Sequence, residues 1–487
     1  MFPTYGRAAA LLSSLGFMAA LVQCVGDTPV VQDSGVDAAP DSGVDAAPDV
    51  TLPDSSTDAD AAASKCVFPE AGAPGTLDLT FQAQFYPGLT HGQGAAFDSA
   101  GAIYVGGWDQ GTTCNPPQGS AYAYFAKMTN SGALDTNFGS GGHLCVHPTT
   151  LSTEFNALAA DPDGTVLAAG FSSDLSTSAA NTHALVARVT SAGQLVSSFG
   201  ASGTLSFDAF SGDRTVADAV ALDTSVSPAK IVVAGSNIYY FAATPSKAWV
   251  MRFGHDGSPD LTFNGGQPVV DTTSFGFYGV TVVNGSIFVT GGAGNPSQPT
   301  AIVRKLTPAG AWDSSFGGGN AVPVPLGANN SGMGEGVVAL GTGVAIAGPK
   351  TAGVAYGDPA AVAAISATGA VSSGFGTGGS VDTAYAGQPL LFETLYQFGA
   401  ISSDCEGRLL VSTALHSDAG ASYEVAVTRL LTTGAMDTTF GASGIALASG
   451  FNAHAATNPV EDPKTGGVLV LIRDPTTANL GLIRFNR

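Results

Sequence analysis

The stretch GALDTNFG at residues 132–139 decides the fold of this 487-residue chain, because it recurs along the sequence. Related octads are GQLVSSFG at 193–200 and GAMDTTFG at 434–441. Seven copies occur, and each has a glycine six residues before a phenylalanine. The phenylalanines lie 53 to 65 residues apart and are Phe81, Phe138, Phe199, Phe263, Phe316, Phe375 and Phe440. A period of this length indicates a repeat architecture.

Short apolar runs surround each copy of the motif. Examples upstream of one copy are KIVVAG at 230–235 and AWVMRF at 248–253, and turn dipeptides such as Asn284-Gly285 separate runs of this kind. With the run after the phenylalanine, each unit holds four short strands, and no helical period appears. Four strands per unit predict the blades of an all-β propeller, with the phenylalanines as core wedges between blades. An open solenoid or a row of hairpins is the alternative.

The two ends of the repeat region predict ring closure. Residues 75–487 comprise 413 residues, which seven units of 59 residues fill. The last run, LGLIRFNR at 480–487, has no motif after it, whereas the first motif at 75–81 has no strand before it. We therefore expect the C-terminal strand to dock beside the N-terminal motif and complete a seventh blade.

The motif G-x-L-D-x-x-F-G, preceded by strands such as ALVARV and KIVVAG, resembles the delta-60 repeat family over residues 75–487. That family is typical of bacterial secreted and surface proteins. The resemblance implies no established chemistry. It supports a fold and a cellular location and leaves the activity open.

The N-terminus has the layout of an export signal. Residues 1–23 contain the cation Arg7 and the 15-residue apolar stretch at 8–22, which predicts a signal peptide. The segment Leu21-Val22-Gln23-Cys24 resembles a lipobox, although that family prefers Gly, Ala or Ser where Gln23 stands. We expect Cys24 to be the lipid attachment site. Secretion after cleavage at a small residue, or an uncleaved anchor, is the alternative.

Residues 24–74 are predicted to form a tether. Positions 26–65 carry nine Asp and one Lys, and the unit DSGVDAAP occurs at 33–40 and again at 41–48. A core cannot be built from Asp, Ala, Ser and Pro, so we expect a disordered segment that extends by self-repulsion.

Composition excludes several classes of partner. The formal charge is −21, and only 11% of the residues are charged. Binding to nucleic acid or to an anionic membrane surface needs clustered Lys and Arg, which are scarce here. We expect a monomer that needs no cofactor and contacts a membrane only through the lipid anchor.

Cations and acids recur in a fixed register around the motif. Cations stand five residues before the motif glycine and acids three residues before the phenylalanine, which places them opposite each other across a hairpin. The cations are Lys127, Arg188, Arg252, Lys305, Arg429 and Arg484, and the acids are Asp78, Asp135, Asp260, Asp313 and Asp437. Ala364 and Ser372 replace both partners in one unit, and Arg188 meets Val196. We interpret the pairs as structural, with a ligand-binding ring as the alternative.

Familiar catalytic templates are missing from the sequence. No G-x-S-x-G elbow occurs, and no Lys follows a Gly, which excludes a P-loop. The G-x-G-x-x-G pattern at 374–379 is the repeat motif itself and predicts no dinucleotide site.

Two groups have the residue types of a metal site. Asp161-Pro162-Asp163-Gly164 has the start of a calcium loop but lacks the later acids, so we expect a hairpin turn. His143, Cys145 and His147 alternate along one strand and could face one metal ion, but a disulfide at Cys145 is the favoured interpretation.

The cysteines predict a disulfide framework. With Cys24 lipidated, four of five remain and allow three pairings. We favour Cys114 with Cys145 and Cys66 with Cys405. This choice places Cys114 between the third and fourth strands, Cys145 on the first strand of the next blade, and Cys405 between the second and third strands.

These features predict a lipid-anchored or secreted binding or structural module with a protein or carbohydrate ligand. Its long loops, at 111–122, 236–248 and 415–423, are candidate contact regions, with an aromatic group at 239–241. The alternative is an extracytoplasmic hydrolase or lyase with acids around the propeller channel. The candidate acids are Asp208, Asp213, Asp271, Glu335, Asp382 and Glu393.

Overall fold

The protein is described from a computed structural model. The described residues are 66, 68–69, 72–81, 84–111, 113–118, 120–148, 152–173, 182–211, 213–237, 247–295, 298–350, 358–385, 388–389, 391–392, 401–416, 423–449, 454–455, 459–474 and 476–487. The expected signal peptide, Cys24, most of the expected tether and the aromatic group at 239–241 lie outside these residues.

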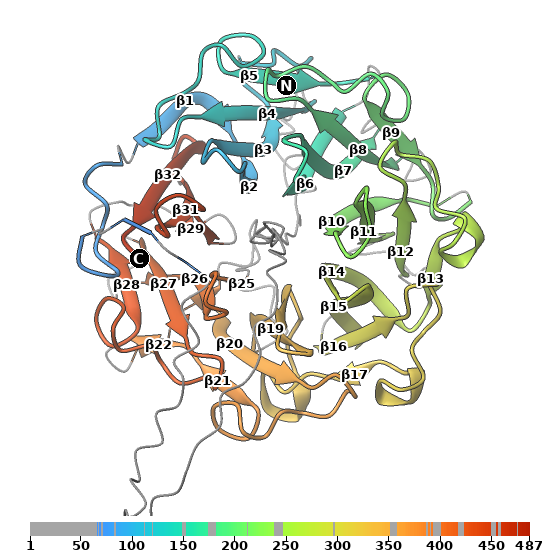
Figure 1. The fold of residues 1–487 in the computed structure, drawn as a ribbon, viewed down its shortest axis with the longest axis vertical. Coiled ribbons are helices and arrows are strands. Elements are labelled where there is room, and N and C mark those ends of the chain that lie inside the picture. The colour runs from blue at the N-terminus through green and yellow to red at the C-terminus, as the bar shows by residue number, and fades with distance from the viewer. Residues whose placement is uncertain are drawn as a thin grey trace, which may run out of the picture.

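Seven antiparallel blades form a ring, which confirms the seven-bladed all-β propeller (Figure 1). Blade 1 contains β2 (Gly92–Phe97), β3 (Ile103–Asp109), β4 (Tyr122–Met128) and β5 (His143–Val146). Blade 2 contains β6 (Ser152–Ala160), β7 (Val166–Ser173), β8 (Thr182–Val189) and β9 (Thr204–Phe207). Blade 3 contains β10 (Val216–Asp223), β11 (Lys230–Ser236), β12 (Ala248–Phe253) and β13 (Val269–Asp271). Blade 4 contains β14 (Ser274–Val283), β15 (Ser286–Asn295), β16 (Gln298–Leu306) and β17 (Val322–Pro323).

The remaining blades follow the same order with small additions. Blade 5 contains β18 (Gly336–Leu340), β19 (Gly343–Pro349), β20 (Asp358–Ile365) and β21 (Ser380–Asp382). Blade 6 contains β25 (Ile401–Ser403), β26 (Leu409–His416), β27 (Tyr423–Leu430) and β28 (Ile445–Ala448). Blade 7 contains β29 (His454–Ala455), β30 (Val460–Glu461), β31 (Val468–Arg473), β32 (Asn479–Phe485) and β1 (Gln84–Thr90). The short strand β24 (Leu391–Phe392) pairs with both β20 and β26, and β22 (Ala384–Tyr385) pairs with β23 (Gln388–Pro389).

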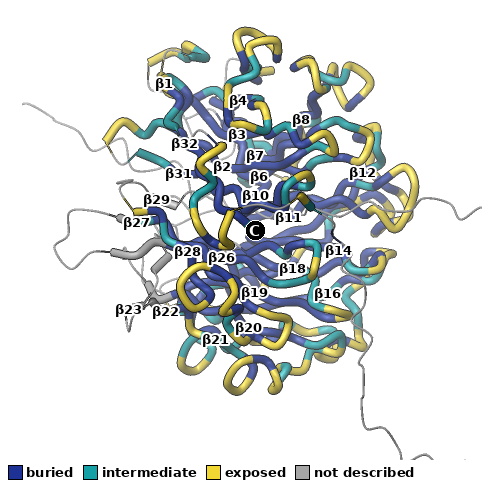
Figure 2. Tube along the Cα trace, turned by 60° about the vertical axis from the view of Figure 1, so that its left-hand side comes forward, coloured by how far each residue is buried: buried dark blue, intermediate teal, exposed yellow. Residues whose placement is uncertain are grey.

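The core lies between the blades, because both faces of each sheet pack against a neighbour. One apolar cluster joins Val232 and Val250 of blade 3 to Val280 and Ile302 of blade 4, with the motif Phe263 among them. All seven motif phenylalanines are at most 3% exposed, as expected for core wedges. Strands are buried and turns exposed over most of the described chain (Figure 2).

The ring closes through the split blade. Strand β1 pairs with β32, with Gln84 opposite Leu482, and Leu77 forms a bridge with Phe485. This arrangement confirms the predicted docking of the C-terminal strand beside the N-terminal motif. Closure satisfies the edges that an open row of blades would leave unpaired.

Each blade has two kinds of ends because its strands alternate in direction. The turns after the first strand and the motif turns after the third strand share one end, which we call the motif face. The connections after the second and fourth strands share the opposite end, which we call the loop face. The repeat motif therefore occupies one face of the ring.

The motif turns are joined from blade to blade by backbone hydrogen bonds. The N–H after each motif phenylalanine donates to the carbonyl that precedes the motif glycine of the next blade, at 2.9 to 3.1 Å. The six described donor and acceptor pairs are Gly139 and Ala192, Gly200 and Asp256, Asn264 and Ala309, Gly317 and Thr368, Gly376 and Thr433, and Gly441 and Pro74. The motif glycine makes this approach possible.

No helix among the described residues is long and apolar enough to cross a membrane.

Candidate functional site

Ion pairs stabilise the motif hairpins. Arg429 Nε donates to Asp437 Oδ2 at 2.7 Å, and Asp437 Oδ1 accepts the backbone N–H and the hydroxyl of Thr439. Burial raises the pKa of Asp437, but the hydrogen bonds from Thr439 and the charge of Arg429 outweigh it, so the pKa lies below its ordinary value. Equivalent pairs, between 2.7 and 3.4 Å, join Lys127 to Asp135, Arg252 to Asp260, Lys305 to Asp313 and Arg484 to Asp78.

Arg188 lies opposite Val196, so its own motif offers no acid. It forms ion pairs with two aspartates of another turn instead. Its Nη2 lies 2.7 Å from Asp161 Oδ2 and 2.8 Å from Asp163 Oδ2, and His255 of blade 3 lies 3.2 Å from Asp163. The expected hairpin turn is closed by a hydrogen bond from Gly164 N to the Asp161 carbonyl, at 2.9 Å. Asp161, Asp163 and His255 are grouped closely enough for a metal ion, but the Arg188 guanidinium already supplies their positive charge. We assign this cluster a structural role.

A second acid, which the repeat motif does not contain, lies close to some of these cations. It stands at the end of the first strand of a blade, and examples are Asp223, 3.4 Å from Arg252, and Asp462, 2.8 Å from Arg484. An alignment of the segments FDSAG, ADPDG, ALDTS and EDPKTG would have revealed this recurring aspartate. Arg252 and Arg484 thus each lie between two acids on the motif face.

The acids proposed for a catalytic channel do not converge. Four of them contact separate basic side chains: Asp208 with His183, Asp213 with Lys247, Asp271 with Arg304, and Asp382 with Lys350. Glu335 is fully buried beside β18, and Glu393 lies outside the described residues. The structure brings none of the described members together as an acid and base pair.

Two buried carboxyl groups that the sequence analysis missed lie on first strands. Burial raises the pKa of Glu154 on β6 to about 8, and it raises the pKa of Asp218 on β10 well above its ordinary value. Asp218 Oδ2 accepts a hydrogen bond from Ser236, while neither oxygen of Glu154 has a partner among the described residues. Because they belong to different blades and no third ionisable group joins them, they do not form a recognisable catalytic set.

Both disulfides have the pairing that the sequence analysis favoured, Cys66 with Cys405 and Cys114 with Cys145. The strand positions given for three of these cysteines were wrong. Cys114 lies between the second and third strands of blade 1, Cys145 lies on the fourth strand of the same blade, and Cys405 lies between the first and second strands of blade 6. The long loop after β3 folds back onto the outer strand, which the run lengths alone did not reveal.

The metal-site alternative at His143, Cys145 and His147 is not supported. The disulfide occupies the Cys145 sulfur, and the ring of His147 stacks on Tyr122 with centroids 4.2 Å apart. His143 remains available for another role.

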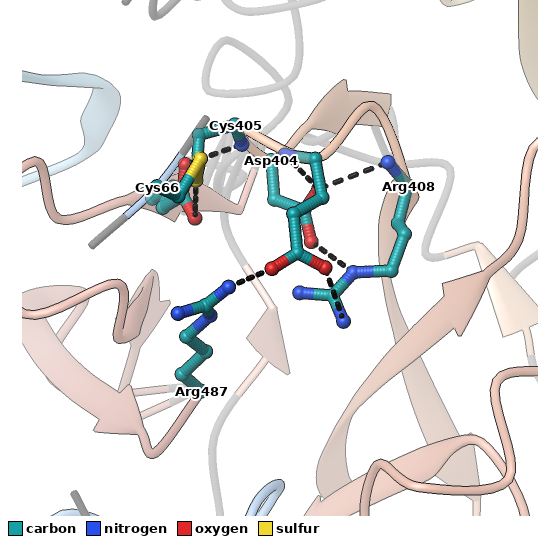
Figure 3. Close-up of a disulfide and its surroundings, with 7 residues drawn as sticks. Cys66, Asp404, Cys405, Arg408 and Arg487 are labelled. Carbon is teal, nitrogen blue, oxygen red and sulfur yellow. Dashed lines mark hydrogen bonds and ion pairs between the residues drawn. A yellow bond between two sulfur atoms is a disulfide. The ribbon is translucent and has the colours of Figure 1, made fainter. Parts of the chain in front are cut away.

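The Cys66–Cys405 disulfide links the start of the described chain to blade 6 of the ring (Figure 3). Beside it, Cys405 N donates to Glu461 Oε2 at 2.7 Å, and Arg487 contacts Glu406. Burial raises the pKa of Glu461 to about 8. These contacts join blade 6, blade 7 and the chain end, so we assign this cluster to closure of the ring.

A groove of about 660 Å³ lies between the outer strand of blade 1 and the motif turn of blade 2, and we call it the blade 1–2 groove. Four segments line it: the loop after β3, the motif turn of blade 1, strand β5 and the motif turn of blade 2. The lining residues are Thr113, Cys114, Asn137, Gly139, Ser140, His143, Leu144, Cys145, Ala192, Gly193 and Gln194. None of these residues is acidic, and none is Lys or Arg.

The walls of the groove are tied together. Cys114 is held by its disulfide to Cys145 and by a 2.9 Å hydrogen bond from its N–H to Asp109 Oδ2. The motif turns of blades 1 and 2 are joined by a backbone hydrogen bond from Gly139 N to Ala192 O, at 3.1 Å. A ligand would therefore meet a largely preformed surface.

Asn137 departs from the repeat consensus at this groove. The other motif copies have Thr80, Ser198, Thr262, Ser315, Gly374 and Thr439 at this position. Hydroxyls there close the turn on the motif aspartate, as Thr439 does on Asp437. Asn137 uses only its backbone N–H, 3.2 Å from Asp135 Oδ1, and its amide has no partner among the described residues.

Gln194 departs from the consensus in the same way, and His143 lies beside it in the groove. Gln194 replaces Thr76, Ala133, Ser258, Ala311, Ala370 and Ala435 of the other copies. His143 is the fifth residue after the motif phenylalanine, a position without a consensus, where the other copies have Tyr86, Thr204, Pro268, Ala321, Ser380 and Ile445. Neither side chain has a hydrogen-bond partner within the described part of the chain. A position-by-position comparison of the repeats would have revealed Asn137 and Gln194, but only the structure shows that they share one groove with His143.

No protein-family profile matches the chain, and no curated protein matches it. Among solved structures, it is similar to Sqt1 of Chaetomium thermophilum bound to the N-terminus of ribosomal protein L10, with 10% identity, 83% of this chain and 98% of that chain covered, and a TM-score of 0.41. It is also similar to the β-propeller domain of the Trilobed protease from Pyrococcus furiosus, with 8% identity, 82% and 94% covered, and a TM-score of 0.41. Drosophila Plexin A in complex with Semaphorin 1b gives 9% identity, 85% and 88% covered, and a TM-score of 0.39.

Proposed function

We propose that this protein is an extracytoplasmic binding module, tethered to the cell surface through Cys24, and that the blade 1–2 groove is its ligand site. The signal-like residues 1–23 and the acidic segment at 26–65 support the location. The groove supports the binding role.

One observation carries the proposal. Asn137 and Gln194 each depart from the repeat consensus, and both line one groove together with His143. In a repeat protein, residues that serve the fold recur at equivalent positions, because each repeat makes the same contacts with its neighbours. A departure at two positions that meet in space is therefore better explained by a ligand than by packing.

A hydrolase or lyase activity lacks a comparable basis. General acid and base catalysis requires two groups within reach of one substrate. The described acids instead contact separate basic side chains or lie buried in different blades.

The location is tested by the intact mass of the native protein, with and without reduction. We expect a chain that begins at Cys24, carries acyl mass, and gains four hydrogens when its two disulfides are reduced. A chain cut elsewhere and free of lipid would contradict the tethered form and indicate a released protein.

The binding role is tested with the disulfide-intact chain from Cys24 onward on an array of immobilised saccharides and peptides. We expect at least one probe to be retained by the wild-type protein and lost by the triple variant Asn137→Ala, His143→Ala, Gln194→Ala. Retention of the same probes by both proteins would place the ligand site elsewhere, and the absence of any retained probe would contradict the binding role.

A further inference from the structure

We propose that the blade 1–2 groove binds a neutral saccharide through the side chains of Asn137, His143 and Gln194. This inference rests on the proposed function, because it names the class of ligand for the same groove. It is carried by the charge, the hydrogen-bonding groups and the strand edge of the groove.

The charge of the groove favours a neutral ligand. Its lining contains no Asp, Glu, Lys or Arg, so a charged ligand would lose hydration without gaining a counter-ion. The net charge of −21 further opposes anions. A cation would be attracted by that charge, but it would find carboxylates elsewhere on the surface and not in this groove.

The polar side chains favour a ligand rich in hydroxyl groups. The amides of Asn137 and Gln194 each offer an oxygen acceptor beside an N–H donor, a spacing that suits two adjacent hydroxyls, and the His143 imidazole can add a further hydrogen bond. An apolar ligand would bury these groups without hydrogen-bond partners, which would weaken its binding. Leu144, Cys145 and the glycine Cα atoms supply apolar area for the faces of sugar rings.

The edge of β5 disfavours an extended peptide, which is the other ligand with many hydrogen-bonding groups. A peptide that adds to a sheet needs free backbone groups along the edge strand. Strand β5 has only four residues, the His143 carbonyl already accepts the Ser140 N–H at 2.8 Å, and the disulfide holds Cys114 against Cys145. Side-chain contacts to a saccharide do not need this edge.

The volume and the rigidity of the groove are consistent with a small-ligand site. About 660 Å³ lies within the range of roughly 300–1,000 Å³ that such sites occupy. Because the disulfide and Asp109 hold one wall, little conformational entropy would be lost on binding.

The test measures dissociation constants by calorimetry for the disulfide-intact chain from Cys24 onward. The probes are neutral oligomers of glucose, galactose, mannose, xylose and N-acetylglucosamine, with alginate and heparin oligomers as anionic comparisons. We expect one neutral series to bind, and the triple variant Asn137→Ala, His143→Ala, Gln194→Ala to weaken it at least tenfold. A double variant, Ser198→Ala with Ser380→Ala, changes equivalent positions in blades 2 and 5 and should leave binding unchanged.

A second variant tests the wall of the groove. Cys114→Ser with Cys145→Ser should weaken the same probe several-fold, while the thermal unfolding curve stays cooperative. Unchanged affinity in this variant and in the triple variant would overturn the site, although the protein would still be a binding module.

The remaining outcomes separate the inference from the proposed function. If a peptide or an anionic oligomer binds and the triple variant abolishes that binding, the groove is a ligand site but the saccharide class is wrong. If the folded wild-type protein binds no probe of any class, both proposals fail.

Discussion

At the scale of single residues, a motif glycine combines a positive φ with a close contact to the backbone of the neighbouring blade. Gly434 has a φ of +81°, and an added Cβ would lie 2.7 Å from the backbone nitrogen of Gly376 in the preceding blade. Gly378 has a comparable φ of +66° but open space where its Cβ would lie. The two residues therefore separate backbone strain from contact between blades.

We predict that Gly434→Ala lowers the free energy of unfolding by about 3 kcal/mol, because strain of about 1–2 kcal/mol is added to a clash between blades. Gly378→Ala is the matched control and should cost only the strain. Urea unfolding of both variants measures the difference. Equal losses would show that the close approach is not important.

Glu154 predicts a dependence of stability on pH. Its pKa is raised to about 8 by burial, so the folded protein keeps the proton while the unfolded chain releases it above its ordinary value of 4.5. The free energy of unfolding should therefore fall as the pH rises from about 4.5 to about 8.

We predict that Glu154→Gln raises the free energy of unfolding by about 2–3 kcal/mol at pH 7.5 and has little effect at pH 4.5. Chemical unfolding at both pH values measures this. Glu424→Gln, at a partly exposed position on β27, is the control. An equal effect of Glu154→Gln at both pH values would argue against a protonated Glu154.

At the scale of the element, the motif hairpin has a charged and an uncharged version. In blade 6, Asp437 receives Arg429 and closes the turn with Thr439. In blade 5, Ser372 and Ala364 occupy the equivalent positions, yet the same hairpin forms with a 2.9 Å bond from Ser372 N to Ala364 O. The backbone and the glycine thus define the turn, and the ion pair adds stability.

We predict that Asp437→Ala lowers the free energy of unfolding by about 3 kcal/mol, because it leaves the buried Arg429 without its closest acid. Ser372→Ala should cost less than about 0.5 kcal/mol. Because the pKa of Asp437 is lowered, its contribution is present above the ordinary value of 3.8 and is lost as the pH falls through the lowered one. Unfolding at pH 7 and pH 2.5 tests this. A similar loss in both variants would contradict the role of the pair.

At the scale of the whole molecule, the ring depends on contacts between the two ends of the chain. Arg484 of β32 reaches Asp78 at 2.7 Å, 406 residues away in the sequence. The Cys66–Cys405 disulfide adds a covalent link with a separation of 339 residues, whereas Cys114 and Cys145 are 31 residues apart.

We predict that the variant Cys66→Ala with Cys405→Ala is less stable than Cys114→Ala with Cys145→Ala. The entropy of closing the longer loop corresponds to about 6 kcal/mol, and that of the shorter loop to about 4 kcal/mol. Unfolding midpoints in guanidinium compare the two variants against the wild-type protein. A larger loss from the shorter loop would show that local packing outweighs chain entropy.

The repeated motif by itself determined the fold class, the blade number, the split blade and the motif ion pairs. Each of these follows from local periodicity, since a strand pattern and a turn repeated seven times have few ways to bury their apolar faces. The pairing of the four cysteines also followed, although the strand positions used to argue it were wrong.

Only the tertiary structure decided which residues meet across blades. Asn137 and Gln194 lie 57 residues apart and at different positions of their repeats, so no spacing along the chain relates them. The path of the loop after β3 likewise depends on the position of β5, to which it is joined by the Cys114–Cys145 disulfide. The proximity of Asn137 and Gln194 arises because neighbouring blades pack face to face, which brings the outer strand and motif turn of blade 1 beside the motif turn of blade 2.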